Sequence, residues 1–294
     1  MPHIEIRPAR PEDRDAVLAF CTNTWEWGDY IEGVWDDWLN NPQGLLLVAT
    51  ADGQPVGVAH ILMLNETDAW FEGMRVDPNY RRQGIASALF TAQVAEAKRR
   101  GAIRARLVTS SGNTSALRLI ERAAIRQVGG FVLFRAAPVT TPPKREYGQE
   151  ALELATTADI DAIIHYLNTS NIFPVVGGLY YYHGFTAYSI TDTLLQAKVS
   201  AQQVYLLRRW DRLDGLAIAE PGEEWRGEQL SLGYIDGTTE SISLIAYALR
   251  RKLPEMGLES IFAYVPDLIM VRDAFIGAEY QTEGDVFYTY EQDL

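Results

Sequence analysis

A basic segment that contains a glycine joins an apolar run to a helical pattern in the first half of the chain. It reads Arg81-Arg82-Gln83-Gly84-Ile85-Ala86-Ser87 and follows a predicted strand that ends at Val76. The first N–H groups of a helix have no partners within the helix and carry a partial positive charge. Gly84 and Ala86 leave this backbone open to a ligand, and the two arginines add positive charge. The segment therefore predicts a site for an anion such as a pyrophosphate.

The residues of this turn do not by themselves identify the anion. A P-loop would need Gly-Lys-Ser/Thr here, and a dinucleotide-binding turn would need Gly-x-Gly-x-x-Gly. The sequence has neither pattern at this position. The prediction is therefore an anion site that belongs to neither of these two motifs.

The composition restricts the partners and the compartment. The net charge is −13, and so acidic a chain is a poor nucleic-acid binder. No apolar run approaches the roughly 18 residues of a membrane span, and the charged first residues do not resemble a signal peptide. A single cysteine, Cys21, favours a reducing compartment, so we expect the cytoplasm. The four histidines lack metal-ligand spacing, so we expect no metal.

The elements that position the turn alternate between strands and helices. Apolar runs at 45–49 and 56–64 flank Asp52-Gly53, which is typical of a hairpin. Apolar spacing predicts a helix from Gly84 to about Arg100, and apolar residues three and four apart predict a long helix over 242–253. The second half of the chain repeats the element order of the first in outline. We therefore predict an α/β (α+β) fold of two tandem domains, each a mixed, mostly antiparallel central sheet flanked by helices.

A proline-rich segment separates the two halves. Pro138, Pro142 and Pro143 stand close together, which excludes a helix or a central strand. We predict domains at 1–137 and 150–294, joined by a linker at 138–149. The halves also differ in charge, with 15 basic and 16 acidic side chains up to residue 140, and 11 and 23 after it.

Three motif pieces in the first half resemble the GNAT acetyltransferase superfamily. Arg81–Ala86 fits the family pattern Arg/Gln-x-x-Gly-x-Gly/Ala, and Glu72–Pro78 is similar to the strand that precedes it. Asn113–Ala116 fits the family's Asn-x-x-Ala at a helix start. The resemblance covers residues 3–136 through motifs, and 150–292 through element order alone. We therefore expect a GNAT domain at 1–137 and a degenerate GNAT-like domain at 150–294.

The resemblance implies acetyl-coenzyme A as the cofactor and implies which residues hold it. The strand at Met74–Val76 would separate from its neighbour and pair with the pantetheine arm, and the Met74 N–H would polarise the acetyl carbonyl. The residues implied in cofactor binding are Met74, Arg75, Val76, Arg81, Arg82, Gln83, Gly84, Ile85, Ala86, Ser87, Asn113 and Ala116.

A direct transfer of acetyl to an amine also needs a group that accepts the amine proton. Glu72 matches the family's acid on this strand and is the predicted catalytic base, with Glu26 as the second candidate. The alternative is that Glu72 is a solvated or salt-bridged strand residue. Ile120 stands where the family usually has the tyrosine that protonates the leaving thiolate. We therefore expect Ile120 to be a core residue, and another proton source to serve the thiolate.

The segment 25–38 has five acids, no base and four tryptophans. In the resembling family this region covers the acceptor, and carboxylates with aromatic faces suit a cationic amine. The alternative is an amphipathic helix with Trp35 and Trp38 in the core. The predicted acceptor-binding residues are Glu26, Trp27, Asp29 and Tyr30.

Two segments of the second half are also informative. The aromatic run 177–185 either faces a substrate or packs against the protein, and we favour packing. Residues 234–241 take the place of the anion-binding turn but contain two acids and no arginine. We therefore expect that the second domain does not hold coenzyme A in the usual way.

Together these features predict an acetyl-coenzyme A-dependent N-acetyltransferase that acts on a small, cationic amine by direct attack. A non-catalytic module that binds or senses acyl-coenzyme A is the alternative from another class, and Ile120 favours it. A purely structural protein is a third interpretation, against which Arg81, Arg82 and Gly84 argue.

Overall fold

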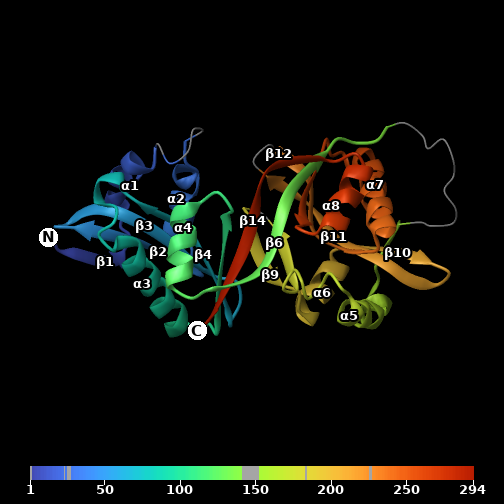
Figure 1. Cartoon of the computed structure of the whole chain (residues 1–294), viewed down its shortest axis with the longest axis horizontal. Coiled ribbons are helices and arrows are strands. Elements are labelled where there is room, and N and C mark those ends of the chain that lie inside the picture. The colour runs from blue at the N-terminus through green and yellow to red at the C-terminus, as the bar shows by residue number, and fades with distance from the viewer. Residues whose placement is uncertain (1, 23, 25–27, 141–151, 183, 225–226) are drawn as a thin grey trace. The chain divides into compact units, whose positions relative to one another are not determined.

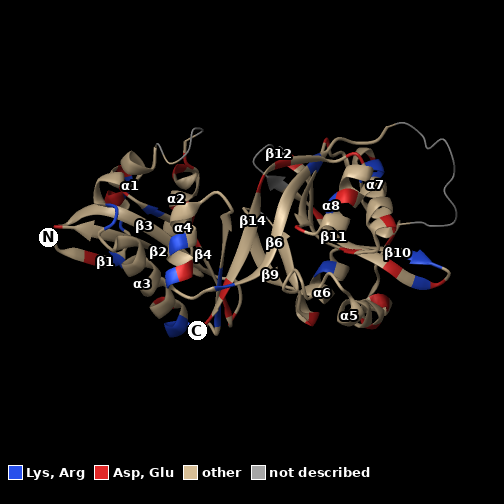
Figure 2. Ribbon diagram, viewed as in Figure 1, with Lys and Arg blue, Asp and Glu red and all other residues tan. Residues whose placement is uncertain are grey.

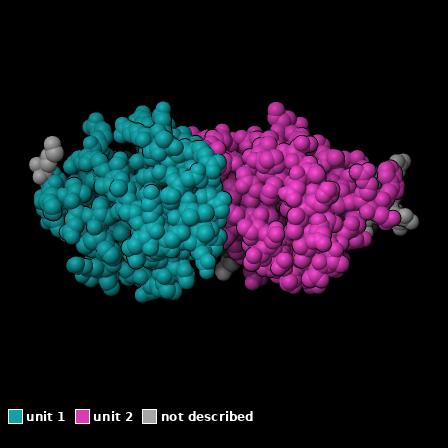
Figure 3. Space-filling model, turned by 90° about the horizontal axis from the view of Figure 1, so that it is seen from below, with its two compact units in different colours: residues 1–108, 114–126, 290–294 teal, residues 109–113, 127–289 magenta. Residues whose placement is uncertain are grey.

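The computed structural model describes the chain except for residues 1, 23, 25–27, 141–151, 183 and 225–226 (Figure 1). The residues form two compact units, which Figure 3 distinguishes by colour. Unit 1 comprises residues 1–108, 114–126 and 290–294, and unit 2 comprises residues 109–113 and 127–289.

Unit 1 is built on a mixed sheet with helices on both faces. The strands follow the order β1, β2, β3, β4, β5, and the last residues of β14 lie beside β5. The β4–β5 pair is parallel, and the pairs from β1 to β4 are antiparallel. The elements are β1 (Ile4–Pro8), η1 (Pro11–Asp13), α1 (Arg14–Cys21), α2 (Ile31–Asn40), β2 (Gly44–Ala51), β3 (Gln54–Met63), β4 (Asp68–Val76), η2 (Pro78–Tyr80), α3 (Ile85–Arg99), β5 (Arg104–Ser110) and α4 (Thr114–Arg122).

Two of these elements confirm their sequence signals directly. Asp52 and Gly53 connect β2 to β3 with φ of 49° and 88°, the two left-handed residues of a type I′ turn. The helix predicted to begin at Gly84 is α3, and Gly101 follows its end with a φ of 95°.

The core of unit 1 has two parts. One cluster includes Ile85, Leu89 and Phe90 of α3 together with strand residues. The other joins α1 and α2 to strand residues and includes Trp35 and Trp38, which are 0% and 9% exposed. The interpretation that both tryptophans belong to the core is therefore confirmed.

In unit 2 the strands follow the order β14, β6, β13, β12, β11, β10, β7. A separate hairpin consists of β8 and β9. The elements are β6 (Arg126–Ala136), β7 (Leu152–Leu154), η3 (Thr157–Asp159), α5 (Ile160–Thr169), β8 (Leu179–Tyr182), β9 (Thr186–Ser189), α6 (Asp192–Ser200), β10 (Val204–Arg209), β11 (Arg212–Glu224), β12 (Gly227–Gly237), α7 (Thr239–Met256), β13 (Ile261–Pro266), α8 (Ile269–Gly277) and β14 (Gln281–Asp293).

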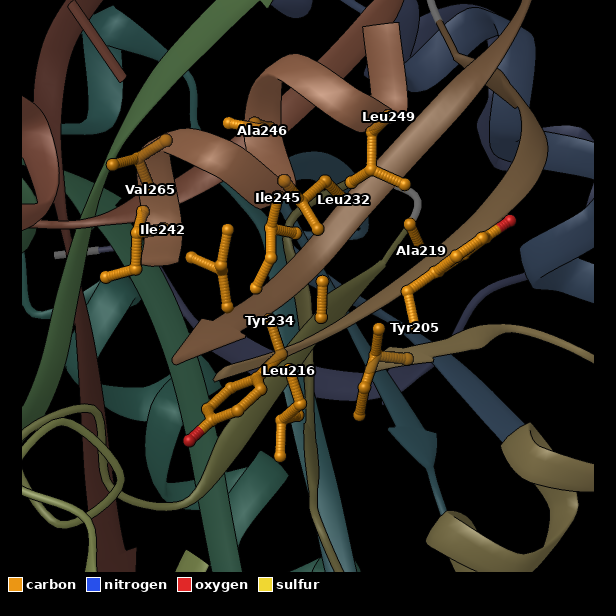
Figure 4. Packing of buried hydrophobic residues seen from close by; sticks show 14 of the residues in the cluster. Tyr205, Leu216, Ala219, Leu232, Tyr234, Ile242, Ile245, Ala246, Leu249 and Val265 are labelled. Carbon is orange, nitrogen blue, oxygen red and sulfur yellow. The ribbon is translucent and has the colours of Figure 1, made fainter. Parts of the chain in front are cut away.

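The core of unit 2 lies between α7 and the strands beneath it. Figure 4 shows side chains of α7 directed at apolar side chains of the sheet. The buried helix residues recur at the predicted spacing of three and four, which places them on one face of α7. These helix residues are Ile242, Ile245, Ala246, Leu249 and Leu253.

The division into units differs from the predicted boundary in three places, the first being residues 109–113, which belong to unit 2. Nearly all of β6 belongs to unit 2, because Phe131–Ala136 pairs antiparallel with β13. Tyr290–Leu294 belongs to unit 1, and the Leu294 N–H donates to the Ile103 carbonyl at 2.8 Å. Of the predicted linker at 138–149, only 138–140 lies within the described residues.

Candidate functional site

The segment between β4 and α3 forms an exposed turn in unit 1. The Asp77 carboxylate accepts the Asn79 N–H at 2.8 Å and fixes the start of the turn. Arg82 and Gly84 both have left-handed backbone conformations, with φ of 61° and 83°. The side chains from Arg81 to Gly84 are exposed. The predicted anion-binding residues therefore lie on the surface, at the beginning of a helix.

The helix start offers free amides to a ligand. The Ala88 N–H donates to the Gly84 carbonyl at 2.9 Å, which is the first hydrogen bond of α3. The amides before Ala88 consequently have no acceptor within the helix. A Cβ at Gly84 would meet no atom within 4 Å, so nothing in the protein closes the turn at this point. Open amides beside two arginines suit the charge and the size of a pyrophosphate.

The strand that leads to this turn separates from its neighbour. The parallel register between β4 and β5 contains three pairs and ends at Trp70 and Arg106. Within the described register, the rest of β4 is paired on one side only, with β3. The resemblance implies that the strand separates from its neighbour at Met74–Val76, which lies within this part of β4.

A bulge interrupts β4 next to the opening. Val58 pairs with Arg75 and His60 pairs with Glu72, so the register skips Gly73 and Met74. Gly73 has a φ of 67°, which suits a bulge residue without a side chain. The backbone at Met74 is thereby turned out of the regular ladder.

Glu72 has a partner that the sequence analysis did not identify. The Glu72 carboxylate lies 2.9 Å from Nδ1 of His60, which stands directly opposite on β3. The Glu72 side chain is 21% exposed, whereas the His60 ring is buried and stacks on Trp38 at 4.5 Å. The predicted base thus combines access to solvent with a fixed partner on one side.

Two of the predicted acceptor-binding residues, Asp29 and Tyr30, contact the side chain of Arg75. The Asp29 carboxylate accepts from Nε of Arg75 at 2.8 Å, and both side chains are largely buried. The Arg75 guanidinium lies 5.1 Å from the centroid of the Tyr30 ring. Asp29 therefore offers no uncompensated charge. Glu26 and Trp27 lie outside the described residues.

The helix that carries the predicted Asn-x-x-Ala motif is α4. Ala116 stands in its first turn in unit 1, whereas Asn113 belongs to unit 2. Ile120 is 4% exposed and brings an apolar side chain to the position where the resembling family has a tyrosine. This position can supply no proton. Cys21 is also buried, and burial raises the pKa of its thiol to about 12.

In unit 2 the strands β12 and β13 also separate after a short parallel register, but the β8–β9 hairpin packs into the gap between them. The parallel register of β12 with β13 also has three pairs, and the β11–β12 register shifts beside Gly233. A Cβ at Gly233 would lie 2.0 Å from the Tyr181 carbonyl oxygen, so β8 packs directly on this backbone. The Tyr181 hydroxyl bonds to Thr289, and its ring stacks on Tyr264 of β13. The aromatic run 177–185 thus contributes Tyr180 and Tyr181 to packing within unit 2, where they are 1% and 3% exposed.

The N-terminus of α7 in unit 2 differs from that of α3, because it is capped by a side chain and carries an acid. Thr238 caps α7 by accepting the Ser241 N–H at 3.1 Å. Arg209 is the last residue of β10 and pairs with Glu240 at 3.0 Å. Figure 2 shows basic residues in blue at the end of this strand. The buried Asp236 carboxylate accepts hydrogen bonds from the Ser170 and Tyr234 hydroxyls, and burial raises the pKa of Asp236. These contacts support the expectation that unit 2 lacks the anion site of unit 1.

Metal-binding clusters and membrane-spanning helices are both absent from the described residues. These residues contain no group of three or more His, Cys, Asp or Glu side chains that could hold a metal ion. They also contain no helix that is long and apolar enough to cross a membrane.

Comparison with known proteins relates this geometry to acetyltransferases. Residues 14–124 match the model of the acetyltransferase (GNAT) family. A mycothiol acetyltransferase from Clavibacter sepedonicus is 34% identical over 110 residues, which are 37% of this chain and 36% of that protein. The match thus spans little more than a third of that relative.

Solved structures extend the similarity of fold to nearly the whole chain. A GCN5-related N-acetyltransferase from Sphaerobacter thermophilus covers 99% of this chain over 95% of its own, with 14% identity and a TM-score of 0.65. The glucosamine N-acetyltransferase region of a fungal multi-domain GH3 β-N-acetylglucosaminidase covers 99% of this chain over 38% of its own, with 12% identity and a TM-score of 0.64. The chain therefore shares its fold with these two proteins over nearly all of its length.

Proposed function

We propose that this chain transfers an acetyl group from acetyl-coenzyme A to the amine of a small molecule, because its residues 14–124 match the model of the acetyltransferase (GNAT) family. The observation that carries the proposal is the open, arginine-flanked start of α3, which follows a strand separated from its neighbour. The first feature suits a pyrophosphate, and the second leaves room for an extended arm beside it.

The proposed cofactor contacts follow from these two features. The amides of Arg82, Gln83, Gly84, Ile85 and Ala86, with Ser87 and the charge of Arg81, would hold the pyrophosphate. The backbone of β4 at Met74, Arg75 and Val76 would pair with the pantetheine arm, and Asn113 and Ala116 are also proposed to contact it. The bound thioester supplies the acetyl group, and the reaction forms a C–N bond while the C–S bond breaks.

Glu72 is the proposed base. It accepts a proton from the ammonium form of the acceptor, which leaves a neutral amine able to attack the carbonyl. The Met74 N–H, turned out of the ladder by the bulge, would donate to the carbonyl oxygen as negative charge develops there. Since Ile120 cannot protonate the leaving thiolate, that proton comes from water or from the protonated Glu72.

The acceptor would bind beside Glu72, among residues that include Glu26, Trp27, Asp29 and Tyr30. Arg75 compensates the charge of Asp29, which favours an acceptor with one amine over a polyamine. The similarity to mycothiol acetyltransferase makes that enzyme's acceptor and simple amino sugars the first compounds to test.

The test combines calorimetry with a thiol-release assay on the full chain. Calorimetric titration with acetyl-coenzyme A should give one site per chain, because the β8–β9 hairpin fills the opening in unit 2. Release of free thiol should then depend on an amine from a panel of amino sugars, polyamines and basic peptides. Absence of binding would refute the proposal, and two sites would refute the assignment of a filled second unit.

A second candidate function is favoured by one observation. Ile120 is buried and apolar where a proton donor is usual, which would suit a module that binds or senses acyl-coenzyme A without turnover. Tight binding without thiol release across the whole panel would support this alternative.

A further inference from the structure

The strand pairing places one buried histidine against the proposed base. Residues 60 and 72 are direct partners in the antiparallel register of β3 and β4, so their side chains share one face of the sheet. Nδ1 of His60 lies 2.9 Å from Oε1 of Glu72. The His60 ring is 1% exposed, and the Glu72 side chain is 21% exposed.

Packing fixes the orientation of the His60 ring. The ring lies parallel to Trp38, with an interplanar angle of 6° and 4.5 Å between the centroids. On its other edge the chain passes so close that a Cβ at Gly44 would lie 2.5 Å from Nε2. The ring therefore cannot turn away from Glu72 without a rearrangement of the core.

The surroundings of Nε2 decide the protonation state of the ring. Nε2 is buried and has no hydrogen-bond partner among the described residues. A positively charged imidazole would place an N–H there without an acceptor, which is costly in a buried site. A neutral ring with its proton on Nδ1 leaves only a lone pair at Nε2. In this tautomer Nδ1–H donates to the Glu72 carboxylate.

We propose that His60 is a positioning residue, which stays neutral and holds the Glu72 carboxylate through its Nδ1–H. This inference deepens the proposed function and rests on it. A neutral donor orients one carboxylate oxygen without placing a positive charge beside the base. The other oxygen remains available to the acceptor amine. An arginine in the same place would fix the carboxylate equally well but would disfavour its protonation.

A mutant cycle tests this role. Glu72→Gln should lower kcat by about 100-fold or more. His60→Leu should lower kcat by about 10- to 100-fold and leave the KM for acetyl-coenzyme A unchanged, because the base is misplaced and the cofactor site is not. The double variant should be no slower than Glu72→Gln alone, since His60 acts only through Glu72. His60→Asn, whose amide can donate from the Nδ1 position, should recover most of the loss.

Gln93→Leu provides the matched control. It removes a hydrogen bond to the His60 backbone and disturbs the same core without removing the donor to Glu72. It should lower the melting temperature as His60→Leu does and keep kcat within about threefold. Full activity in His60→Leu, additive losses in the double variant, or equal losses in His60→Asn and His60→Leu would overturn the proposal.

A second readout does not depend on turnover. The ¹⁵N shifts of the imidazole of His60 report its tautomer, and the chain has only four histidines to distinguish. The expected result is a neutral ring with its proton on Nδ1. A charged ring, or one with its proton on Nε2, would overturn the inference even in an active enzyme. If no amine supports thiol release, the proposed function fails, and the tautomer still decides the contact between His60 and Glu72.

Discussion

Gly73 meets two requirements at the bulge in β4. Its φ of 67° is left-handed, and a Cβ would lie 2.4 Å from two ring carbons of Trp38. Gly73→Ala should lower the free energy of unfolding by about 2 to 5 kcal/mol, the sum of a left-handed alanine and an overpacked contact. Urea unfolding monitored by tryptophan fluorescence measures this change.

The control for this substitution lies in the β2–β3 turn. Gly53 has a φ of 88°, and a Cβ there would meet no atom within 4 Å. Gly53→Ala should therefore cost only the backbone term, about 1 to 2 kcal/mol. Equal losses in the two variants would show that the Trp38 contact does not constrain the bulge.

A buried ion pair makes stability depend on pH. Arg7 donates two hydrogen bonds of 2.7 Å to Asp13, and the Arg10 N–H donates a third. Chiefly through the Arg7 hydrogen bonds, the pKa of Asp13 is lowered. A lowered pKa stabilises the fold above the ordinary value near 4, and this stabilisation is lost as pH falls through the folded-state value.

The corresponding variant is Asp13→Asn. At pH 7 its free energy of unfolding should be lower than that of the wild type by on the order of 3 kcal/mol, because Arg7 is left without its carboxylate partner. The difference from the wild type should narrow below about pH 4. Denaturant titrations at several pH values measure both curves, and a difference that stays constant down to pH 2 would contradict the assignment.

At the residue scale, the motif was sufficient to predict Glu72 as a candidate base. The residues in contact with it could be predicted only from the pairing of the strands. The hairpin loop centres on Glu66, so residues 60 and 72 are symmetric about it and could have been paired by counting. The Asp29–Arg75 ion pair could not, because it joins residues 46 apart that share no periodic pattern. Asp29 was consequently predicted as a free carboxylate for the acceptor.

At the scale of elements, a side chain at position 84 should weaken the binding of a ligand at the start of α3. Its φ of 83° penalises an alanine by about 1 to 2 kcal/mol, and the new Cβ would stand where the ligand approaches. Gly84→Ala should weaken the binding of acetyl-coenzyme A about tenfold or more, as measured by calorimetry. Gly53→Ala carries a similar backbone penalty and should bind with unchanged affinity.

Elements with strong local signals were predicted, and those that depend on tertiary packing were not. The Asp52-Gly53 hairpin and the apolar spacing of α3 and α7 are local and gave the right elements. The β8–β9 hairpin and α6 were not predicted. Both strands of this hairpin have four residues, and β8 is buried by contacts with β12 rather than marked by alternation.

At the scale of the whole molecule, the segment Tyr290–Leu294 completes unit 1. Glu291 is 6% exposed and pairs with buried Arg106 at 2.6 Å and also with Arg126. Glu291→Gln would leave the charge of Arg106 poorly compensated, since the nearest other carboxylate, Asp68, lies 3.5 Å away. The free energy of unfolding of unit 1 should therefore fall by about 3 to 5 kcal/mol.

Differential scanning calorimetry measures this loss as a lower melting temperature of the transition that acetyl-coenzyme A stabilises. Asp293→Asn is the control, because Asp293 also faces Arg126 but is 76% exposed. Its effect should remain within about 0.5 kcal/mol. A Glu291→Gln variant as stable as this control would show that the segment is dispensable.

The duplicated fold could be recognised from element order, whereas the assignment of strands to units could not. Each half shows the same succession of patterns, which suffices to predict two similar sheets. Strand partners that are distant in sequence, such as β6 with β13, leave no local signal. The predicted boundary at residue 137 therefore separates β6 from the sheet to which it belongs.

The position of Tyr290–Leu294 also has a consequence for synthesis. These residues are translated roughly 160 residues after the rest of unit 1. At 5 to 20 residues per second, the ribosome needs about 8 to 30 s for that interval. Unit 1 is therefore nearly all made first but cannot bury Arg106 against Glu291 until unit 2 has been translated. A nascent chain should remain sensitive to protease in its N-terminal part throughout this interval, and should become resistant only when residue 294 has left the ribosome.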